Sequence, residues 1–267
     1  MMKLLLGLLL VVLSSAWRPC AAQDDPPASS DPPRPPSVST ERPVNWLKLA
    51  PNIARDQKAI WMFPLTMAGG HHLKPALTLA GLTAGIVATL DVPSGKYFRS
   101  TQSFAGFNRA FSGANTSAAM FAVPSVFYGI SLLRKDVYGQ HTFLLAGEAV
   151  LDSEVLTTVM KDLDRRMKPI EVPTNGDFGD TWFRSHAGSP MRGIGSFPSG
   201  HGIAAFSLAT VFADRYPKPR WLAVAAYGAA AAIGFSRVSL QSHHPSDVFA
   251  GAFLGYTIAH YVVLHPK

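Results

Sequence analysis

The sequence predicts an all-α protein, a helical bundle of about six core helices with its functional site at one end. Apolar residues make up 48% of the 267 residues and charged residues only 15%, against about 25% charged residues in an average globular domain. Beyond residue 45 the chain consists of long apolar segments separated by glycine and proline. Alternation of apolar and polar residues, the pattern of a strand, is scarce. Such segments are typical of a helical bundle.

The N-terminal residues 1–22 predict a secretory signal peptide. Lys3 supplies the positive end, residues 4–13 are apolar, and Cys20-Ala21-Ala22 offers a small-residue cleavage site. Cleavage would remove the only cysteine of the chain, so the mature protein would hold no disulfide bond. Residues 23–45 are rich in proline and predict an extended linker, which leaves 46–267 as the helical domain.

Seven helices are expected in the helical domain, and Pro124 is expected to kink or divide the third of them. Their predicted ranges are 54–62, 74–90, 103–134, 139–167, 199–214, 220–237 and 245–264.

The sequence is compatible with a bundle that crosses a membrane and with a soluble bundle. A span needs about 20 apolar residues, so the uncharged runs 110–133 and 248–266 are long enough, whereas 75–90 and 221–236 are short. The segment 139–167 carries acidic residues that are costly in lipid. A membrane-associated protein is slightly favoured over a soluble periplasmic bundle.

The charge of the chain, formally +7, suits an anionic substrate or a membrane surface. No basic run is interleaved with aromatic residues, so nucleic-acid binding is not expected. Arg134, Lys135 and the basic turn 215–220 fall at the end of the bundle opposite the blocks described next. In a spanning protein these positive loops would stay cytoplasmic, so the active site would face outward.

The first of three separated polar blocks contains Lys161 and Lys168, followed by Pro169. Two lysines seven residues apart share one face of a helix, and Pro169 would end it. Arg165 lies on nearly the same side. This cationic edge can hold phosphate oxygens, although in isolation a solvated helix surface explains it better.

The second block is Pro198-Ser199-Gly200-His201, just before an apolar run. Ser199 is a candidate N-cap, and the free amides of a helix start bind anions. Gly200 permits close approach of the backbone to a phosphate. His201 would lie at the mouth of the site. An ordinary capped helix with a surface histidine is the plainer explanation of this block.

The third block contains Ser236-Arg237, then His243, and then Asp247 four residues later. Arg237 can make a forked contact to phosphate oxygens. At a spacing of four residues, the Asp247 carboxylate can accept a hydrogen bond from one nitrogen of His243 and leave the other nitrogen free for attack on phosphorus. His244 is expected to be a bystander or a support for its neighbour.

Together the three blocks resemble the signature of the type 2 phosphatidic acid phosphatase / vanadium haloperoxidase superfamily. The chain departs from it at Lys168, where the family usually has arginine; lysine keeps the charge but loses the forked geometry. The resemblance implies that His243 is the nucleophile, that His201 is the general acid and that Asp247 orients His243. It further implies a set of ligands for the phosphoryl oxygens: Lys161, Lys168, Ser199, Gly200 and Arg237.

The resemblance implies a metal-independent phosphatase that hydrolyses phosphate monoesters or pyrophosphates through a phosphohistidine. The signal peptide predicts that it is exported, and the resemblance together with the apolar helices favours lipid phosphates as substrates. No cofactor is expected, and vanadate should inhibit. Three alternatives stay open: a soluble acid phosphatase of broad specificity, a haloperoxidase with vanadate as its cofactor, and a non-catalytic envelope protein that binds phospholipid head groups. The loop 170–197, which carries Trp182, is expected either to overhang the site or to be an uninvolved surface loop.

Overall fold

The computed structural model describes residues 42–70, 73–185 and 191–266. The chain divides into two compact units, residues 1–42 and 43–267, and the second contains every helix of the described residues. The predicted signal peptide, and the predicted linker apart from residues 42–45, lie outside the described residues. The boundaries of both segments therefore stay predictions.

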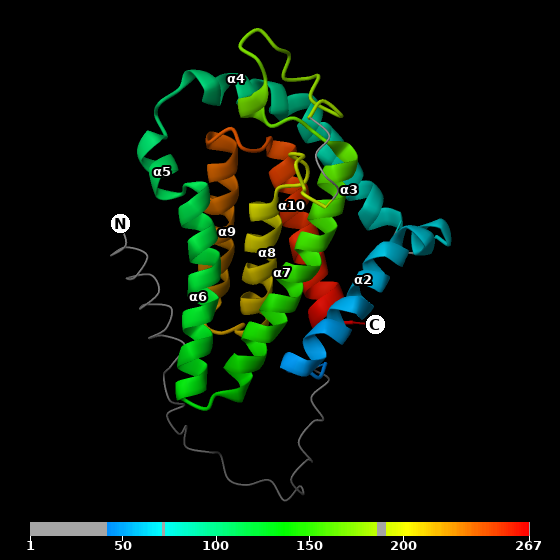
Figure 1. The fold of residues 1–267 in the computed structure, drawn as a ribbon, viewed down its shortest axis with the longest axis vertical. Coiled ribbons are helices and arrows are strands. Elements are labelled where there is room, and N and C mark those ends of the chain that lie inside the picture. The colour runs from blue at the N-terminus through cyan, green and yellow to red at the C-terminus, as the bar shows by residue number, and fades with distance from the viewer. Residues whose placement is uncertain (1–41, 71–72, 186–190, 267) are drawn as a thin grey trace, which may run out of the picture. The chain divides into compact units, whose positions relative to one another are not determined.

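Every regular element of the described residues is helical, which confirms the predicted all-α class (Figure 1). In chain order the elements are α2 (Trp46–Ala68), α3 (Leu73–Ile86), η1 (Val87–Asp91), α4 (Val92–Ser100), α5 (Ala105–Ala110), α6 (Gly113–Leu133), α7 (Val137–Asp164), η2 (Pro169–Glu171), α8 (Gly200–Arg215), α9 (Arg220–Ser239), α10 (Pro245–Thr257) and η3 (Ile258–Leu264). The segments η1 and η3 are π-helical, and η2 is a 3₁₀ turn.

Helix α8 is the central element, packed against α7, α9 and α10 (Figure 1). Its Ile203 and Val211 are completely buried. Close packing of α10 on α8 depends on Gly251, where an added Cβ would lie 2.7 Å from the carbonyl oxygen of Ser199. The absence of a side chain there lets the starts of α8 and α10 touch. As a result, the Ser199 N–H donates a hydrogen bond to the Asp247 carbonyl oxygen at 2.9 Å.

Two acidic residues in the middle of α7 are buried inside the protein. Glu148 accepts a hydrogen bond from the Asn52 amide at 2.7 Å, and Asp152 accepts one from the Gln57 amide at 2.9 Å. Both amides belong to α2, and both carboxylates are 0% exposed. The cost expected for these charges in lipid does not arise, because α2 covers them and supplies hydrogen bonds.

The predicted division of the third helix at Pro124 does not occur, while a kink there stays a prediction. The segment predicted as one helix is divided at residues 111–112, where the Ser112 side chain accepts a hydrogen bond from the Asn115 N–H and caps α6. Helix α6 then runs through Pro124 without interruption. Proline removes a single backbone donor, which a long apolar helix tolerates, whereas a serine cap starts a new helix.

The helix over 139–167 also ends earlier than predicted. Helix α7 stops at Asp164, because Arg165 adopts a left-handed backbone with φ of 43°. The next residues run in an extended path to Pro169. Lys161 and Lys168 therefore do not share a helix face, which corrects the sequence prediction.

Four helical segments are long and apolar enough to cross a membrane: Leu73–Ser100, Gly113–Leu133, Arg220–Ser239 and Pro245–Leu264. The sequence analysis had indicated only two such segments. It counted the runs 75–90 and 221–236 only as far as the next charged residue, whereas both helices continue beyond it. Only 6% of the apolar window of the first segment and 17% of the second are buried. Such exposed apolar surface supports association with a membrane.

Candidate active site

The three polar blocks lie together at one end of the bundle, where α7 and α9 end and α8 and α10 begin (Figure 1). A Cβ added to Gly200 would lie 3.5 Å from Lys161 Nζ, so the first two blocks meet there. The third block joins them through the hydrogen bond between Ser199 and Asp247. Alternation of helix direction thus gathers residues that are far apart in the sequence.

His243 is held by one ring nitrogen. Its Nδ1 lies 2.7 Å from the carbonyl oxygen of Ser196, and a carbonyl only accepts, so Nδ1 carries the proton. The lone pair is then on Nε2, which has no hydrogen-bond partner among the described residues. Burial lowers the pKa of His243, while the nearby Asp247 raises it. The ring is therefore oriented with an unprotonated nitrogen available for reaction.

The contact of His243 with Asp247 is less direct than the spacing predicted. Nδ1 lies 3.7 Å from Asp247 Oδ2, because the Ser196 hydroxyl takes the intervening place. Ser196 Oγ donates to Asp247 Oδ2 at 2.6 Å and lies 3.3 Å from His243 Nδ1. Ser196 is completely buried. It was not among the predicted site residues.

Asp247 is fixed by a buried arginine that the sequence analysis missed. Arg166 Nη1 lies 2.5 Å from Asp247 Oδ1, and Nη2 lies 2.6 Å from Asp91 Oδ2. Each of these three side chains is at most 1% exposed. Trp182 stacks on the guanidinium at 4.3 Å, and Ser246 Oγ accepts from Nη1 at 2.7 Å. Trp182, from the loop that was predicted to overhang the site, thus contacts the arginine that fixes Asp247.

Asp91 binds both Arg166 and the start of α10. Its Oδ1 accepts a hydrogen bond from the Ser246 backbone N–H at 3.0 Å, and its Oδ2 accepts one from the Ser246 hydroxyl at 2.5 Å. Asp91 therefore satisfies a free amide at a helix N-terminus. Through this contact, η1 positions the helix that carries Asp247.

His201 lies at the first turn of α8 and contacts the start of α6. Its Nε2 lies 3.0 Å from Ser117 Oγ and 3.4 Å from the Gly113 carbonyl oxygen. Burial, followed by the positive charge of Arg237, lowers the pKa of His201 to about 4. The free site therefore holds His201 in its neutral form at neutral pH.

Arg237 closes the site on the same side as α6. Its guanidinium donates to the Phe111 carbonyl oxygen and, at 2.8 Å, to Ser236 Oγ. A Cβ on Gly113 would lie 3.4 Å from Nη1. The junction of α5 and α6 is thus part of the site, which the sequence spacing did not indicate.

Lys161 is the lysine of the first block that faces the α8 N-terminus. Burial lowers its pKa, the charge of Glu154 raises it, and the charge of Lys168 lowers it. Burial in turn raises the pKa of Glu154. Glu154 Oε1 lies 3.8 Å from the position of a Cβ on Gly200, so a carboxyl group accompanies Lys161 beside the helix start.

Lys168 lies outside the buried network. Its Nζ is 3.4 Å from Glu171 Oε1, and both side chains are partly exposed. The Lys168 backbone N–H also donates to Glu171 at 3.1 Å. The buried cation that contacts Asp247 is Arg166, two residues earlier.

His244 is completely buried next to His243. Its Nε2 lies 3.2 Å from the Met167 carbonyl oxygen, while Nδ1 is buried without a hydrogen-bond partner among the described residues. This ring therefore links the start of α10 to the segment after α7.

The arrangement suits an anion better than a metal ion. The Lys161 ammonium and the amides of the α8 start can contact phosphate oxygens, as can Arg237. The buried carboxylates Asp91 and Asp247 are engaged by Arg166, and the Glu154 carboxyl lies beside Lys161. The imidazole rings of His243 and His201 lie at the same end of the bundle.

The C-terminal part of the chain is similar to known proteins. Residues 141–266 match the model of the PAP2 superfamily. A lipid A 1-phosphatase of Rhizobium etli is 34% identical over 106 residues, which cover 40% of this chain and 42% of that protein. A lipid A 1-phosphatase of Porphyromonas gingivalis is 41% identical over 64 residues, 24% of this chain and 14% of that protein. The chain thus aligns with less than half the length of either relative.

The crystal structure of a transmembrane PAP2 type phosphatidylglycerolphosphate phosphatase from Bacillus subtilis is also similar, with 19% sequence identity and a TM-score of 0.39. The match covers 78% of this chain and 94% of that one. The match to the PAP2 superfamily is thus confined to residues 141–266, which contain all three polar blocks.

Proposed function

We propose that this protein is an exported, membrane-associated phosphatase that hydrolyses lipid phosphates through a phosphohistidine and without a metal ion. The observation that carries the proposal is the state of His243: its Nδ1 is fixed by the Ser196 carbonyl at 2.7 Å, which leaves the Nε2 lone pair for attack. Lys161, Arg237 and the α8 N-terminus supply positive charge at the same end.

In the first step, His243 Nε2 attacks phosphorus. The bond from Nε2 to phosphorus forms as the bond from phosphorus to the lipid oxygen breaks, and His201 gives its proton to that oxygen. The His243 ring then carries positive charge. The Ser196 carbonyl and the Asp247 carboxylate stabilise that charge, because both lie on the Nδ1 side.

Protonation of His201 is coupled to binding of the substrate. In the free site Arg237 and burial hold the pKa of His201 at about 4. A phosphate between Lys161 and Arg237 places negative charge beside the ring and raises that pKa. His201 thus gains a proton when a phosphate binds, and it can then donate this proton to the leaving oxygen.

In the second step, water attacks the phosphohistidine. His201, now neutral, accepts a proton from the water as the new oxygen–phosphorus bond forms. The bond between phosphorus and His243 Nε2 breaks, the electron pair returns to the ring, and inorganic phosphate leaves. Each histidine ends in its starting protonation state, so the cycle balances.

The substrate class follows from the surroundings of the site. Four helices are apolar enough to cross a membrane, which keeps the site next to lipid head groups. Two relatives are lipid A 1-phosphatases, which favours a phosphate on a membrane lipid. The basic turns lie away from the site, so we place the site on the outer side of the membrane.

The test is phosphate release by the full-length chain purified in detergent, with EDTA present. The substrates are lipid A, phosphatidate, an isoprenoid pyrophosphate and p-nitrophenyl phosphate. We expect turnover that vanadate inhibits and that His243→Ala abolishes. A 32P-labelled substrate should label the unaltered protein but not this variant.

Full turnover by His243→Ala, or turnover that needs a metal, would refute the proposed mechanism. Preference for p-nitrophenyl phosphate over every lipid would indicate the soluble acid phosphatase class. Bromide oxidation with peroxide and vanadate, without phosphate release, would indicate a haloperoxidase. Binding of the lipids without turnover would indicate a non-catalytic protein.

A further inference from the structure

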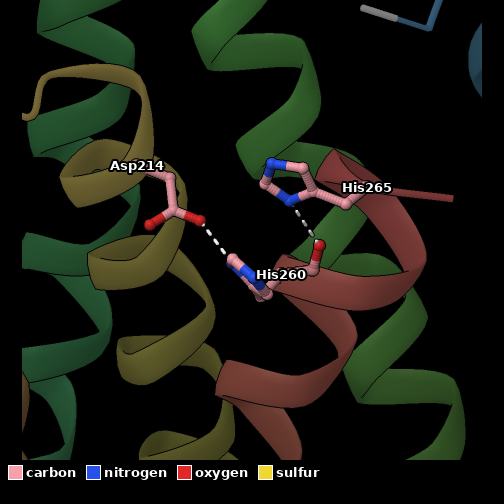
Figure 2. Close-up of side chains that lie close together, drawn as sticks. All are labelled: Asp214, His260 and His265. Atoms are coloured by element: carbon pink, nitrogen blue, oxygen red, sulfur yellow. Dashed lines mark hydrogen bonds and ion pairs between the residues drawn. The ribbon is translucent and has the colours of Figure 1, made fainter.

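A second cluster of histidine and carboxylate side chains lies at the other end of α8. Asp214 from the last turn of α8 faces His260 and His265 from the η3 end of the chain, as Figure 2 shows. Ligand atoms from the three residues lie within 4.8 Å of one another. Asp214 is fourteen residues from Gly200, which corresponds to about 20 Å along a helix. The cluster is therefore separate from the candidate active site.

We propose that Asp214, His260 and His265 form a binding site for one divalent transition-metal ion of the zinc class. Two imidazoles and a carboxylate are a ligand set that such ions favour. Three protein ligands leave a further position for water, as in an open site. The proposal is independent of the phosphatase activity and assigns a metal ion to the opposite end of the bundle.

The protonation state of His265 is the one that a metal ligand requires. Its Nδ1 lies 3.0 Å from the His260 carbonyl oxygen, which only accepts, so Nδ1 carries the proton. The lone pair is therefore on Nε2. A backbone carbonyl that accepts from the second nitrogen is the usual orienting partner of a metal-bound histidine. The His265 backbone N–H donates to the same oxygen at 3.0 Å.

The π-helical winding of η3 brings the two histidines together. Hydrogen bonds in such a helix join residues five apart, which is the separation of His260 and His265. Their ring centroids lie 4.5 Å apart. In an α-helix the same two residues would point in directions about 140° apart. π-helical turns occur often at functional sites, which agrees with the proposal.

The His260 ring is held in place before any ion binds. Its Nδ1 lies 2.6 Å from Asp214 Oδ2, Tyr256 stacks on it nearly parallel at 5.5 Å, and Tyr261 meets it edge-on at 4.6 Å. About a quarter of each side chain of the Asp214–His260 pair is exposed, 28% and 27%. The pair is thus ordered, yet an ion can reach it from solvent.

A bound ion would fasten η3 to α8. These two elements belong to the helices that carry the candidate active site at their opposite ends, with His201 on α8 and Asp247 on α10. A ligand that binds only the folded protein raises its stability. The expected consequence is a metal-dependent gain in thermal stability.

The test is metal binding by the full-length chain, purified in detergent without a histidine tag and stripped with a chelator. Zn²⁺ is titrated by calorimetry, and Co²⁺ by its visible absorption. We expect one equivalent to bind the unaltered chain, and at least tenfold weaker binding after His260→Ala or His265→Ala. Loss of the residue that orients a metal ligand lowers metal affinity about 10–100-fold, and loss of the ligand itself should lower it by at least as much.

Two further variants make the result decisive. Asp214→Asn keeps the size of the side chain and removes the charge, so it should also weaken binding if His260→Ala does not fold. His141→Ala is the matched control, since α7 meets the same end of α8 through the Tyr138 hydroxyl, which donates to the Arg215 carbonyl oxygen at 2.6 Å. This control should keep full affinity.

Thermal unfolding provides a second measurement. Zn²⁺ should raise Tm of the unaltered chain and of His141→Ala, but not of Asp214→Asn. If Zn²⁺ binds the unaltered chain and the three cluster variants equally, the site does not exist. The cluster variants could also lose the same amount of stability, relative to the unaltered chain, whether or not Zn²⁺ is present. That result would show that the Asp214–His260 pair only connects the helices, and it would also overturn the proposal.

Discussion

Asp247 is the most constrained residue of the candidate site. Its Oδ1 faces the Arg166 guanidinium at 2.5 Å, and its Oδ2 accepts from the Ser196 hydroxyl at 2.6 Å and from the His244 N–H at 2.8 Å. With so many donors fixed around it, Asp247 cannot turn toward a substrate. In the proposed mechanism, its role is to hold negative charge beside His243.

Arg166 should therefore be essential to stability as well as to activity. Arg166→Met leaves Asp91 and Asp247 buried without their shared cation. Breaking a buried ion pair costs about 3–5 kcal/mol, so we expect a loss of that order in unfolding free energy and loss of phosphate release. Thermal unfolding in detergent and the phosphatase assay measure the two effects.

Arg184→Met is the matched control for this prediction. Arg184 pairs with Asp180, but 56% of its side chain is exposed, and exposed pairs contribute little. Its replacement should leave stability close to that of the unaltered chain. Equal stability of the Arg166 and Arg184 variants would contradict the assigned role of the buried network.

His201 should make the stability of the free protein depend on pH. Its pKa is lowered from 6.5 to about 4, so between these values the unfolded chain binds a proton at His201 that the folded chain does not. The contribution of neutral His201 to stability is thus fully present above pH 6.5 and is lost as the pH falls toward 4. His201→Gln should lose less stability than the unaltered chain over that range.

Thermal unfolding at several pH values checks this expectation, with His141→Gln as a control for the removal of a histidine. The control should follow the unaltered chain. An identical pH dependence of the unaltered chain and His201→Gln would show that burial does not act on this ring as described.

At the scale of the elements, the sequence predicted the long helices α3, α6, α7, α8, α9 and α10 and the end of the bundle where the blocks meet, but not the short helix α4. Those predictions succeeded because apolar runs and glycine or proline mark helices locally. The end of α7 was missed because Arg165 is a left-handed cap without glycine or asparagine, which carries no usual signal. Lys168 was consequently placed on a helix face that does not exist.

The supporting residues could not be predicted from spacing. Asp91 and Arg166 are 75 residues apart in the chain, and Asp214 and His260 are 46 apart, so only tertiary packing brings each pair together. Arg166 is adjacent to Arg165 in a charged stretch that resembles a solvated surface. A buried arginine has no local pattern that distinguishes it from an exposed one.

The start of α6 offers a test of such a tertiary contact. Ser117 Oγ lies 3.0 Å from His201 Nε2, and a typical hydrogen bond contributes about 1 kcal/mol. Ser117→Ala should therefore lower the unfolding free energy by about 1 kcal/mol, and the loss of the same contact in the transition state should lower kcat by roughly fivefold. Phosphate release and thermal unfolding measure the two quantities.

Ser125→Ala on the same helix is the control, because Ser125 Oγ donates only to the Phe121 carbonyl oxygen of its own helix, at 2.7 Å. Its kcat should stay at the level of the unaltered chain. If both variants behave alike, α6 covers the site without acting on His201.

At the scale of the whole protein, the proposed function makes the membrane the factor that decides which phosphates reach the site. Helices α7 and α8 lie between the second and the third apolar segment in the chain, and the basic turn 215–220 falls at the end away from His243. Positive loops stay on the cytoplasmic side, so the site should open to the outer side. That side is where a lipid exported across the membrane presents its head group.

Single cysteines can establish this orientation, because Cys20 is the only native cysteine and Cys20→Ser removes it. Thr174→Cys lies in the loop that follows η2, near the candidate site, and Lys218→Cys lies in the basic turn; both positions are exposed. A membrane-impermeant maleimide applied to intact cells should label the Thr174→Cys variant but not the Lys218→Cys variant. After permeabilisation of the cells it should label both variants. The reverse pattern would place His243 on the cytoplasmic side, and the substrate would then be a lipid of the inner leaflet.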